Sequence, residues 1–113
     1  LDKEVAMFGH LFESLVTLSV RVFAQKAEAH VGHLRLHGGR REIDLIVERP
    51  DRKVLAIEVK LSTVVRDADV ENLNWLREQL GTEIVGCLVI NTGPDGYRRK
   101  DGIAVVPAAL LGP

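Results

Sequence analysis

The stretch REIDLIVERPDRKVLAIEVKL, residues 41–61, decides the fold of this chain. Apolar and polar residues alternate in two runs, 41–49 and 53–61, and such alternation is typical of β-strands. Between the runs, residues 50–52 (PDR) are types that favour a turn. The stretch therefore predicts an antiparallel β-hairpin.

The length of the loop decides which residues of the hairpin face each other. If residues 50–52 form the loop, Asp44 lies directly opposite Glu58. Directly opposed side chains project to the same face of a sheet, with Cβ atoms about 5 Å apart. A two-residue loop would instead place Asp44 against Val59, so the proximity of the two acids depends on this register.

Two further elements are predicted before the hairpin. Residues 3–29 contain no proline and a single glycine, and their apolar residues recur at steps of three and four, which predicts a long amphipathic helix. Residues 33–37 (HLRLH) have the period of a short strand. The apolar face of the helix is expected to consist of Phe8, Leu11, Phe12, Leu15, Leu18, Val22 and Phe23.

After the hairpin the hydrophobic period returns to that of a helix. Leucines and a valine form one face over residues 67–80, with Asp67 as the expected N-cap and Gly81 just past the C-terminus. The apolar run 84–90 (IVGCLVI) predicts a central strand that is covered on both faces. A helix between two strands of one sheet implies a crossover and a parallel pair.

The chain is expected to end with a polar loop, 91–102, and an edge strand, 103–106, closed by Pro107. The whole order predicts an α/β fold with an αβββαβ core, in which helices flank a mixed central sheet. Residues 1–113 have the size of one domain. Because the first residue is Leu1, we expect this domain to be a fragment of a longer chain.

Composition excludes several classes of protein. With 15 basic and 16 acidic side chains, the chain cannot bind polyanions through bulk charge, so any nucleic-acid contact must be a local patch. Its single cysteine, Cys87, excludes a disulfide framework, suits the cytoplasm, and is expected to be a buried small hydrophobe. No apolar run is expected to reach the roughly 18 residues of a membrane span.

Three polar residues of the hairpin form a candidate site. Glu58 and Lys60 lie about 7 Å apart on one face of their strand, and Asp44 joins them if the register holds. Two carboxylates this close repel each other unless a proton or cation lies between them, and such oxygen ligands suit Mg²⁺ or Mn²⁺. Glu13, in the predicted first helix, is a further acid that the cluster could accommodate. The opposite face of the second strand is expected to carry Ile43, Leu45 and Val47.

This order of elements, with Glu13, Asp44 and Glu58-Val59-Lys60 in these places, resembles the PD-(D/E)xK nuclease superfamily with its restriction-endonuclease-like fold. The chain is also similar to a domain of unknown function that closes a family of prokaryotic AAA-type P-loop ATPases. That similarity rests on the segments GHLFESLV, GRREIDLIVER, VLAIEVKLS and PAALL and covers nearly the whole chain.

The resemblance implies a cytoplasmic hydrolase that cleaves phosphodiester bonds in nucleic acid, with DNA as the first expectation. Asp44, Glu58 and the backbone carbonyl of Val59 would ligate Mg²⁺ or Mn²⁺. Lys60 would assist the attacking water or stabilise the transition state, and Glu13 would complete or orient the site. The implied partner is an upstream P-loop ATPase domain of the same chain, because this piece has no Walker motif of its own.

Two basic segments are candidate phosphate contacts at the mouth of the site, although ordinary solvated loops have the same composition. They comprise Arg40, Arg41, Arg98, Arg99 and Lys100. No Gln-x-x-x-Tyr pattern follows in the second helix, so the resemblance points to no particular exonuclease branch.

Other interpretations of the same residues remain open. Alternating charges in a hairpin also suit a solvated sheet face or a cross-strand ion pair. A nuclease-like scaffold without catalytic activity could serve the ATPase as an accessory or interaction module. The apolar helical stretch 11–23 alone would also suit a dimerisation domain.

Overall fold

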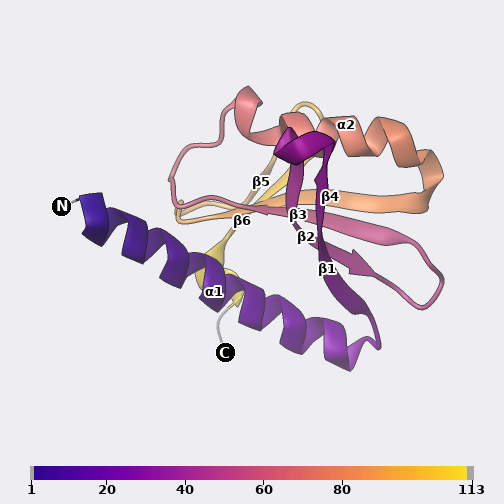
Figure 1. The fold of residues 1–113 in the computed structure, drawn as a ribbon, viewed down its shortest axis with the longest axis horizontal. Coiled ribbons are helices and arrows are strands. Elements are labelled where there is room, and N and C mark those ends of the chain that lie inside the picture. Colours follow the sequence, from indigo (N-terminus) through magenta and orange to yellow (C-terminus); the bar gives the residue numbers. More distant parts are fainter. Residues whose placement is uncertain (1, 112–113) are drawn as a thin grey trace.

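A computed structural model describes residues 2–111 (Figure 1). The expected order of a helix, three strands, a helix and further strands is confirmed. The main elements are α1 (Asp2–Lys26), β1 (His30–Leu36), β2 (Arg41–Glu48), β3 (Val54–Val59), α2 (Glu71–Leu80), β4 (Ile84–Asn91), β5 (Tyr97–Arg98) and β6 (Ala104–Pro107). Short 3₁₀ helices are η1 (His37–Gly39), η2 (Asp67–Val70), η3 (Gly81–Glu83) and η4 (Ala108–Leu111).

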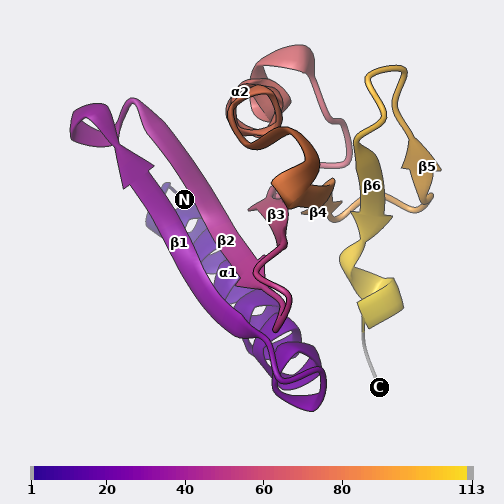
Figure 2. The ribbon, with the colours of Figure 1, turned by 90° about the vertical axis from the view of Figure 1, so that its right-hand side faces the viewer.

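The strands form one mixed sheet in the order β1-β2-β3-β4-β6-β5 (Figure 2). β1, β2 and β3 are antiparallel neighbours, as expected of a hairpin extended by one strand. β3 and β4 are parallel, and α2 makes the crossover between them. The predicted α/β fold, a mixed sheet flanked by helices, is thus confirmed.

The two long helices cover opposite faces of the sheet (Figure 1). Each encloses its own apolar core against the strands, and Cys87 is buried in one of them as predicted. The core beneath α1 contains Val16, Val20, Ala24, Leu45, Val47, Ile57, Val59 and Ile90. The core beneath α2 contains Ile43, Ala56, Val65, Val70, Leu73, Leu76, Cys87, Val89, Ile103 and Val105.

The hairpin has the predicted register. Leu45 pairs with Ile57, and the ladder continues to the turn, where the N–H of Arg49 donates to the carbonyl oxygen of Lys53 at 2.9 Å. Residues 50–52 are therefore the loop. The ladder ends at the Leu45–Ile57 pair, and the next residues of the two strands are Asp44 and Glu58.

A β-bulge in β2 changes the side of the sheet to which some of its side chains point. The pairing of β1 with β2 shifts by one residue between Gly32 and Leu34, which leaves an extra residue in β2. A bulge rotates the neighbouring side chains relative to the regular alternation. The expectation that Ile43 shares a face with Leu45 and Val47 is therefore wrong, because Ile43 belongs to the core beneath α2.

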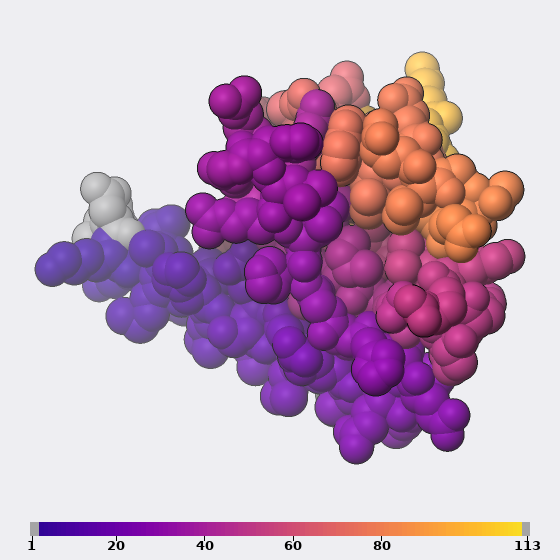
Figure 3. All heavy atoms as spheres, turned by 45° about the vertical axis from the view of Figure 1, so that its right-hand side comes forward, coloured from indigo at the N-terminus to yellow at the C-terminus, as the bar shows by residue number. Residues whose placement is uncertain are grey.

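The predicted apolar face of α1 is mostly not the buried one. Val16, Val20 and Ala24 form a narrow stripe of smaller side chains that packs on the sheet. Of the predicted stripe, only Phe12 packs partly against this core. The larger residues stay exposed, and the N-terminal part of α1 projects from the body of the molecule (Figure 3). Those exposed residues are Val5, Met7, Phe8, Leu11, Leu15, Leu18, Val22 and Phe23.

By length and composition, α1 could cross a membrane. The qualifying segment has 24 residues, Lys3–Lys26. This contradicts the expectation that no apolar run approaches the length of a span. Core helices of soluble proteins and signal sequences satisfy the same two conditions, so these properties alone do not assign α1 to any of the three classes.

The C-terminal strands and the start of the second helix also differ from expectation. β5 lies within the predicted loop 91–102 and pairs with the outer edge of β6. β6 is therefore not an edge strand, and Pro107 is part of it.

At the start of the second helical segment, Arg66 rather than Asp67 is the N-cap, and it precedes the 3₁₀ helix η2. Gly81 follows the helix as predicted, with a φ of 55° that favours glycine.

Candidate functional site

Asp44 and Glu58 lie together where the β2–β3 ladder ends. Beyond the Leu45–Ile57 pair, backbone N–H groups donate to side-chain carboxylates of the opposite strand rather than to its backbone carbonyl oxygens. The N–H of Asp44 donates to Oε1 of Glu58 at 3.0 Å, and the N–H of Val59 donates to Oδ2 of Asp44 at 2.7 Å. Each carboxylate is thus held by the backbone of the opposite strand, which fixes the predicted pair in place.

Burial makes this pair chemically unusual. Glu58 is only 7% exposed, and Asp44 is half-buried. Burial raises the pKa of the Glu58 carboxyl to about 7, and the nearby charge of Asp44 adds to the increase. Burial also raises the pKa of Asp44, against the N–H of Val59 and the charge of Lys60. Near neutral pH the pair therefore favours sharing a proton or binding a cation.

Lys60 is the cationic member of the cluster. Its charge lowers the pKa of both carboxyls, in opposition to the effect of burial. Its Nζ lies 3.8 Å from Oδ1 of Asp69 in η2. Asp69 is held in turn by the N–H of Arg66, which donates to its Oδ2 at 2.8 Å. Sequence reasoning did not assign Asp69 to the site, because Asp67 was the expected N-cap and the structure has Arg66 there instead.

Glu13 does not join the pair. It is exposed on α1, which packs on the face of the sheet that carries Ile57 and Val59, whereas Glu58 projects to the other face. Glu13 instead lines a shallow hollow with Val59 and Leu61. Within residues 2–111, no three His, Cys, Asp or Glu side chains gather as metal ligands. The expectation that Glu13 converges with Asp44 and Glu58 is therefore wrong in this structure.

The geometry of the pair still suits a magnesium-type ion. The hydrogen bonds engage one oxygen of each carboxylate, Oε1 of Glu58 and Oδ2 of Asp44, and the second oxygens remain for another ligand. Mg²⁺ typically binds one or two carboxylates and keeps several waters, so it needs no cage of protein side chains. Val59, whose carbonyl the resemblance adds as a ligand, lies between Glu58 and Lys60 at the end of β3.

Asp44 borders an open hollow of about 240 Å³ between β1 and β2. His33 and Arg35 line the same hollow, and Arg35 forms an ion pair with Glu42 at 3.2 Å. Sequence reasoning did not assign these two basic residues to the site, because the sequence pattern did not show that their strand pairs with β2 beside Asp44. They are the basic side chains that share this hollow with Asp44.

Arg41, a predicted phosphate contact, has internal partners. Its guanidinium carbon lies 5.1 Å from the centroid of the Trp75 ring. Its Nη1 donates to Oδ1 of Asn72 at 3.2 Å. Cation–π stacking and this hydrogen bond fasten the start of β2 to α2.

Arg99 is also committed to the fold. It donates to Oδ1 of Asp67 at 2.6 Å, to Oδ2 of Asp101 at 3.4 Å and to the carbonyl oxygen of Val65 at 3.3 Å. The arginine therefore ties η2 to the turn between β5 and β6. The remaining candidate phosphate contacts are exposed: Arg40, Arg98 and Lys100.

One buried polar residue was not predicted to belong to this region. Asn91, at the end of β4, is 1% exposed, and its Oδ1 accepts no hydrogen bond from the described residues. It directly follows Ile90, whose carbonyl oxygen accepts the N–H of Lys60 at 2.9 Å. Buried unpaired acceptors are rare in proteins, and functional sites are one of the places where they occur.

Comparison with known proteins gives one match. The model of a family described as a domain of unknown function, DUF4143, matches residues 8–111. Neither the curated proteins nor the solved structures contain a match to the chain.

Proposed function

From the premise that the chain belongs to the DUF4143 family of domains of unknown function, we propose that it is a cytoplasmic, metal-dependent nuclease-like domain. The reaction is hydrolysis of phosphodiester bonds in nucleic acid, with DNA as the preferred substrate. The observation that carries this proposal is the interlocked Asp44–Glu58 pair with Lys60 beside it. A P-loop ATPase domain of the same chain is the proposed partner.

In this proposal Asp44 and Glu58 hold Mg²⁺ or Mn²⁺ through their second oxygens, with the carbonyl of Val59. The ion would act as a Lewis acid on the phosphate and lower the pKa of a bound water. Lys60 orients the water or offsets charge that develops on the phosphate, and Asp69 positions Lys60. His33 and Arg35 receive the substrate phosphates in the hollow beside Asp44. Glu13 is left out of this site.

Binding of Mn²⁺ and cleavage of nucleic acid test the proposal together. The protein is titrated with Mn²⁺ by calorimetry, and cleavage of single- and double-stranded DNA and of RNA is followed with Mg²⁺. We expect Asp44→Asn to abolish saturable Mn²⁺ binding, and Lys60→Met to reduce cleavage by at least about a hundredfold while the ion still binds. Asp95→Asn and Lys53→Met are matched controls, because both side chains are exposed outside the site.

Two results would reject a catalytic role. One is cleavage that is the same in the wild type and in Lys60→Met, since contaminating nuclease would then explain it. The other is Mn²⁺ binding that survives in Asp44→Asn. Preferential cleavage of RNA would keep the mechanism and overturn the choice of DNA.

A second candidate function is a non-catalytic interaction module of the ATPase with a nuclease-like scaffold. The displacement of Glu13 from the acid pair favours it, as does the use of Arg41 and Arg99 within the fold. The Mn²⁺ titration separates the two candidates, because a module without a working site would show no saturable binding that depends on Asp44.

A further inference from the structure

The strand β4 is longer than its neighbour β6, which leaves a notch in the sheet. β4 pairs with β3 from Ile84 onward, but its pairing with β6 begins only at Leu88, opposite Ala104. Among the described residues, no strand covers this edge of β4 at positions 84–87. Free backbone N–H and C=O groups at a strand edge can bind a ligand.

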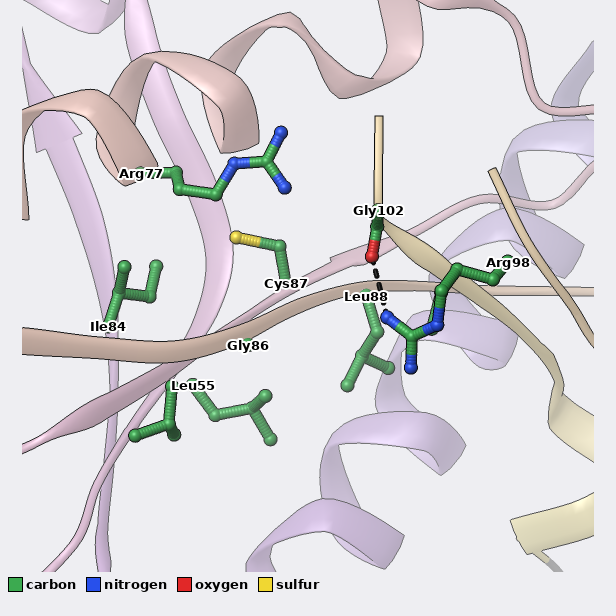
Figure 4. Close-up of a pocket in the computed structure, with 10 residues that line it drawn as sticks. Leu55, Arg77, Ile84, Gly86, Cys87, Leu88, Arg98 and Gly102 are labelled. Atoms are coloured by element: carbon green, nitrogen blue, oxygen red, sulfur yellow. Dashed lines mark hydrogen bonds between the residues drawn. The ribbon is translucent and has the colours of Figure 1, made fainter. Parts of the chain in front are cut away.

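A cavity of about 320 Å³ lies at this notch (Figure 4). Leu55, Ile84 and Leu88 supply apolar parts of its wall, and Gly86 contributes only backbone. Ligand sites in proteins usually have volumes of about 300–1,000 Å³ and mostly apolar walls with a few polar groups. The cavity therefore has the size and lining for a small molecule.

Two arginines from different elements line the cavity, and in Figure 4 their guanidinium groups lie on either side of Gly102. Arg98 of β5 donates from Nη1 to the carbonyl oxygen of Gly102 at 2.7 Å. Arg77 of α2 reaches the same glycine, since a Cβ built on Gly102 would lie 3.4 Å from Arg77 Nη1. Gly102 has a φ of +87°, which favours glycine, so no side chain separates the two guanidinium groups there.

Within residues 2–111, no carboxylate pairs with either guanidinium. The side-chain partner of Arg77 is the neutral amide of Asn74. Asp101 is near, but its charge is paired with Arg99 at 3.4 Å, and its oxygens also accept hydrogen bonds from Asn74 and from the N–H of Ile103. Burial raises the pKa of the Cys87 thiol, so this group also stays uncharged beneath Arg77. The cavity thus combines uncompensated positive charge with an apolar wall.

We propose that this cavity binds a small organic anion. Its carboxylate or phosphate group accepts hydrogen bonds from Arg77 and Arg98, and its apolar body packs on Leu55 and Leu88. The planar fork of a guanidinium matches either oxyanion in a bidentate manner. This site uses neither Asp44 nor Glu58, so it stands independently of the proposed nuclease function.

Binding of simple probe anions tests the site. The metal-free protein is titrated with phenyl phosphate and benzoate, and with inorganic phosphate and benzyl alcohol as probes that lack one half of the proposed ligand. Calorimetry measures affinity, and the amide signals of Gly86 and Gly102 report the location by NMR. Substitutions are Arg77→Gln and Arg98→Gln, with Arg21→Gln as the matched control on the exposed side of α1.

We expect phenyl phosphate or benzoate to saturate the cavity signals, and whichever binds more tightly identifies the head group. Inorganic phosphate and benzyl alcohol should bind at least about tenfold more weakly. Each substitution at Arg77 or Arg98 should weaken binding about tenfold, with partial recovery in Arg98→Lys, while Arg21→Gln changes nothing. Thermal unfolding verifies that every variant is folded.

The proposal is overturned if neither organic anion saturates at millimolar concentration. It is also overturned if the folded arginine variants bind as tightly as the wild type, or if benzyl alcohol binds as tightly as the anions. Because no metal ion is added, a failure here leaves the Mn²⁺ titration of the acid pair unaffected.

Discussion

Asp44 and Glu58 are linked across the hairpin through the main chain, because the N–H of Asp44 donates to Oε1 of Glu58 at 3.0 Å. The same residue that supplies this donor carries a carboxylate that accepts the N–H of Val59. The position of each acid therefore depends on the backbone of the other strand. Neither acid can change its charge without affecting the other, and this dependence should be measurable.

The first consequence is an unusual response of stability to pH. The pKa of Glu58 in the folded protein is about 7, above its ordinary value of 4.5. Between these values the unfolded chain binds fewer protons than the folded one, so the free energy of unfolding falls as pH rises. We expect a loss on the order of 2 kcal/mol between about pH 4.5 and pH 8, measured by urea unfolding without divalent ions. The raised pKa of Asp44 acts in the same direction.

Glu58→Gln should remove most of this loss. The amide oxygen can still accept the N–H of Asp44, but the side chain no longer ionises. The variant should match the wild type near pH 4.5 and exceed it near pH 8. Glu78→Gln, on the exposed side of α2, is the control and should keep the wild-type profile. A wild-type stability that rises over this range would contradict the assigned environment of Glu58.

A divalent ion should stabilise the fold through the same pair. An ion that binds only the folded state adds about 1.4 kcal/mol at ten times its dissociation constant. For a domain of this size, that raises the midpoint of thermal unfolding by roughly 5 °C. We expect Mg²⁺ to produce such an increase in the wild type and in Asp95→Asn. A similar increase in Asp44→Asn would show that the ion binds elsewhere.

The hairpin shows what the sequence could determine. Turn residues at 50–52 and alternation in both strands predicted the hairpin, because each constraint is local, and the structure selects the three-residue loop that brings Asp44 to Glu58 over the two-residue alternative. The bulge opposite β1 could not be predicted from β2 alone, since it depends on how two strands fit together. Glu13 was misplaced for a similar reason: a helical pattern does not say which face of a sheet the helix will cover.

The helix α1 provides a direct test of whether hydrophobic period identifies the buried face of a helix. The helix carries two apolar stripes, and hydrophobic period alone favours the one with the larger side chains. Val16 is 3% exposed and Leu15 is 55% exposed. Val16→Ala should therefore lower the free energy of unfolding by about 2 kcal/mol, whereas Leu15→Ala should change it by less than about 0.5 kcal/mol. Urea unfolding at several protein concentrations measures both values, and a larger loss for Leu15→Ala would mean that its side chain is covered in solution.

Arg99 should act as a structural residue although its sequence context suggested a phosphate contact. Its side chain is 14% exposed and joins Asp67, Asp101 and the carbonyl oxygen of Val65. Arg99→Met should lower the free energy of unfolding by roughly 1–3 kcal/mol, because hydrogen-bond acceptors lose a charged donor. Lys100→Met, at the exposed neighbour, should stay within about 0.5 kcal/mol. If the two variants are equally stable and only Arg99→Met weakens binding of nucleic acid, the structural role of Arg99 is refuted and the phosphate contact is restored.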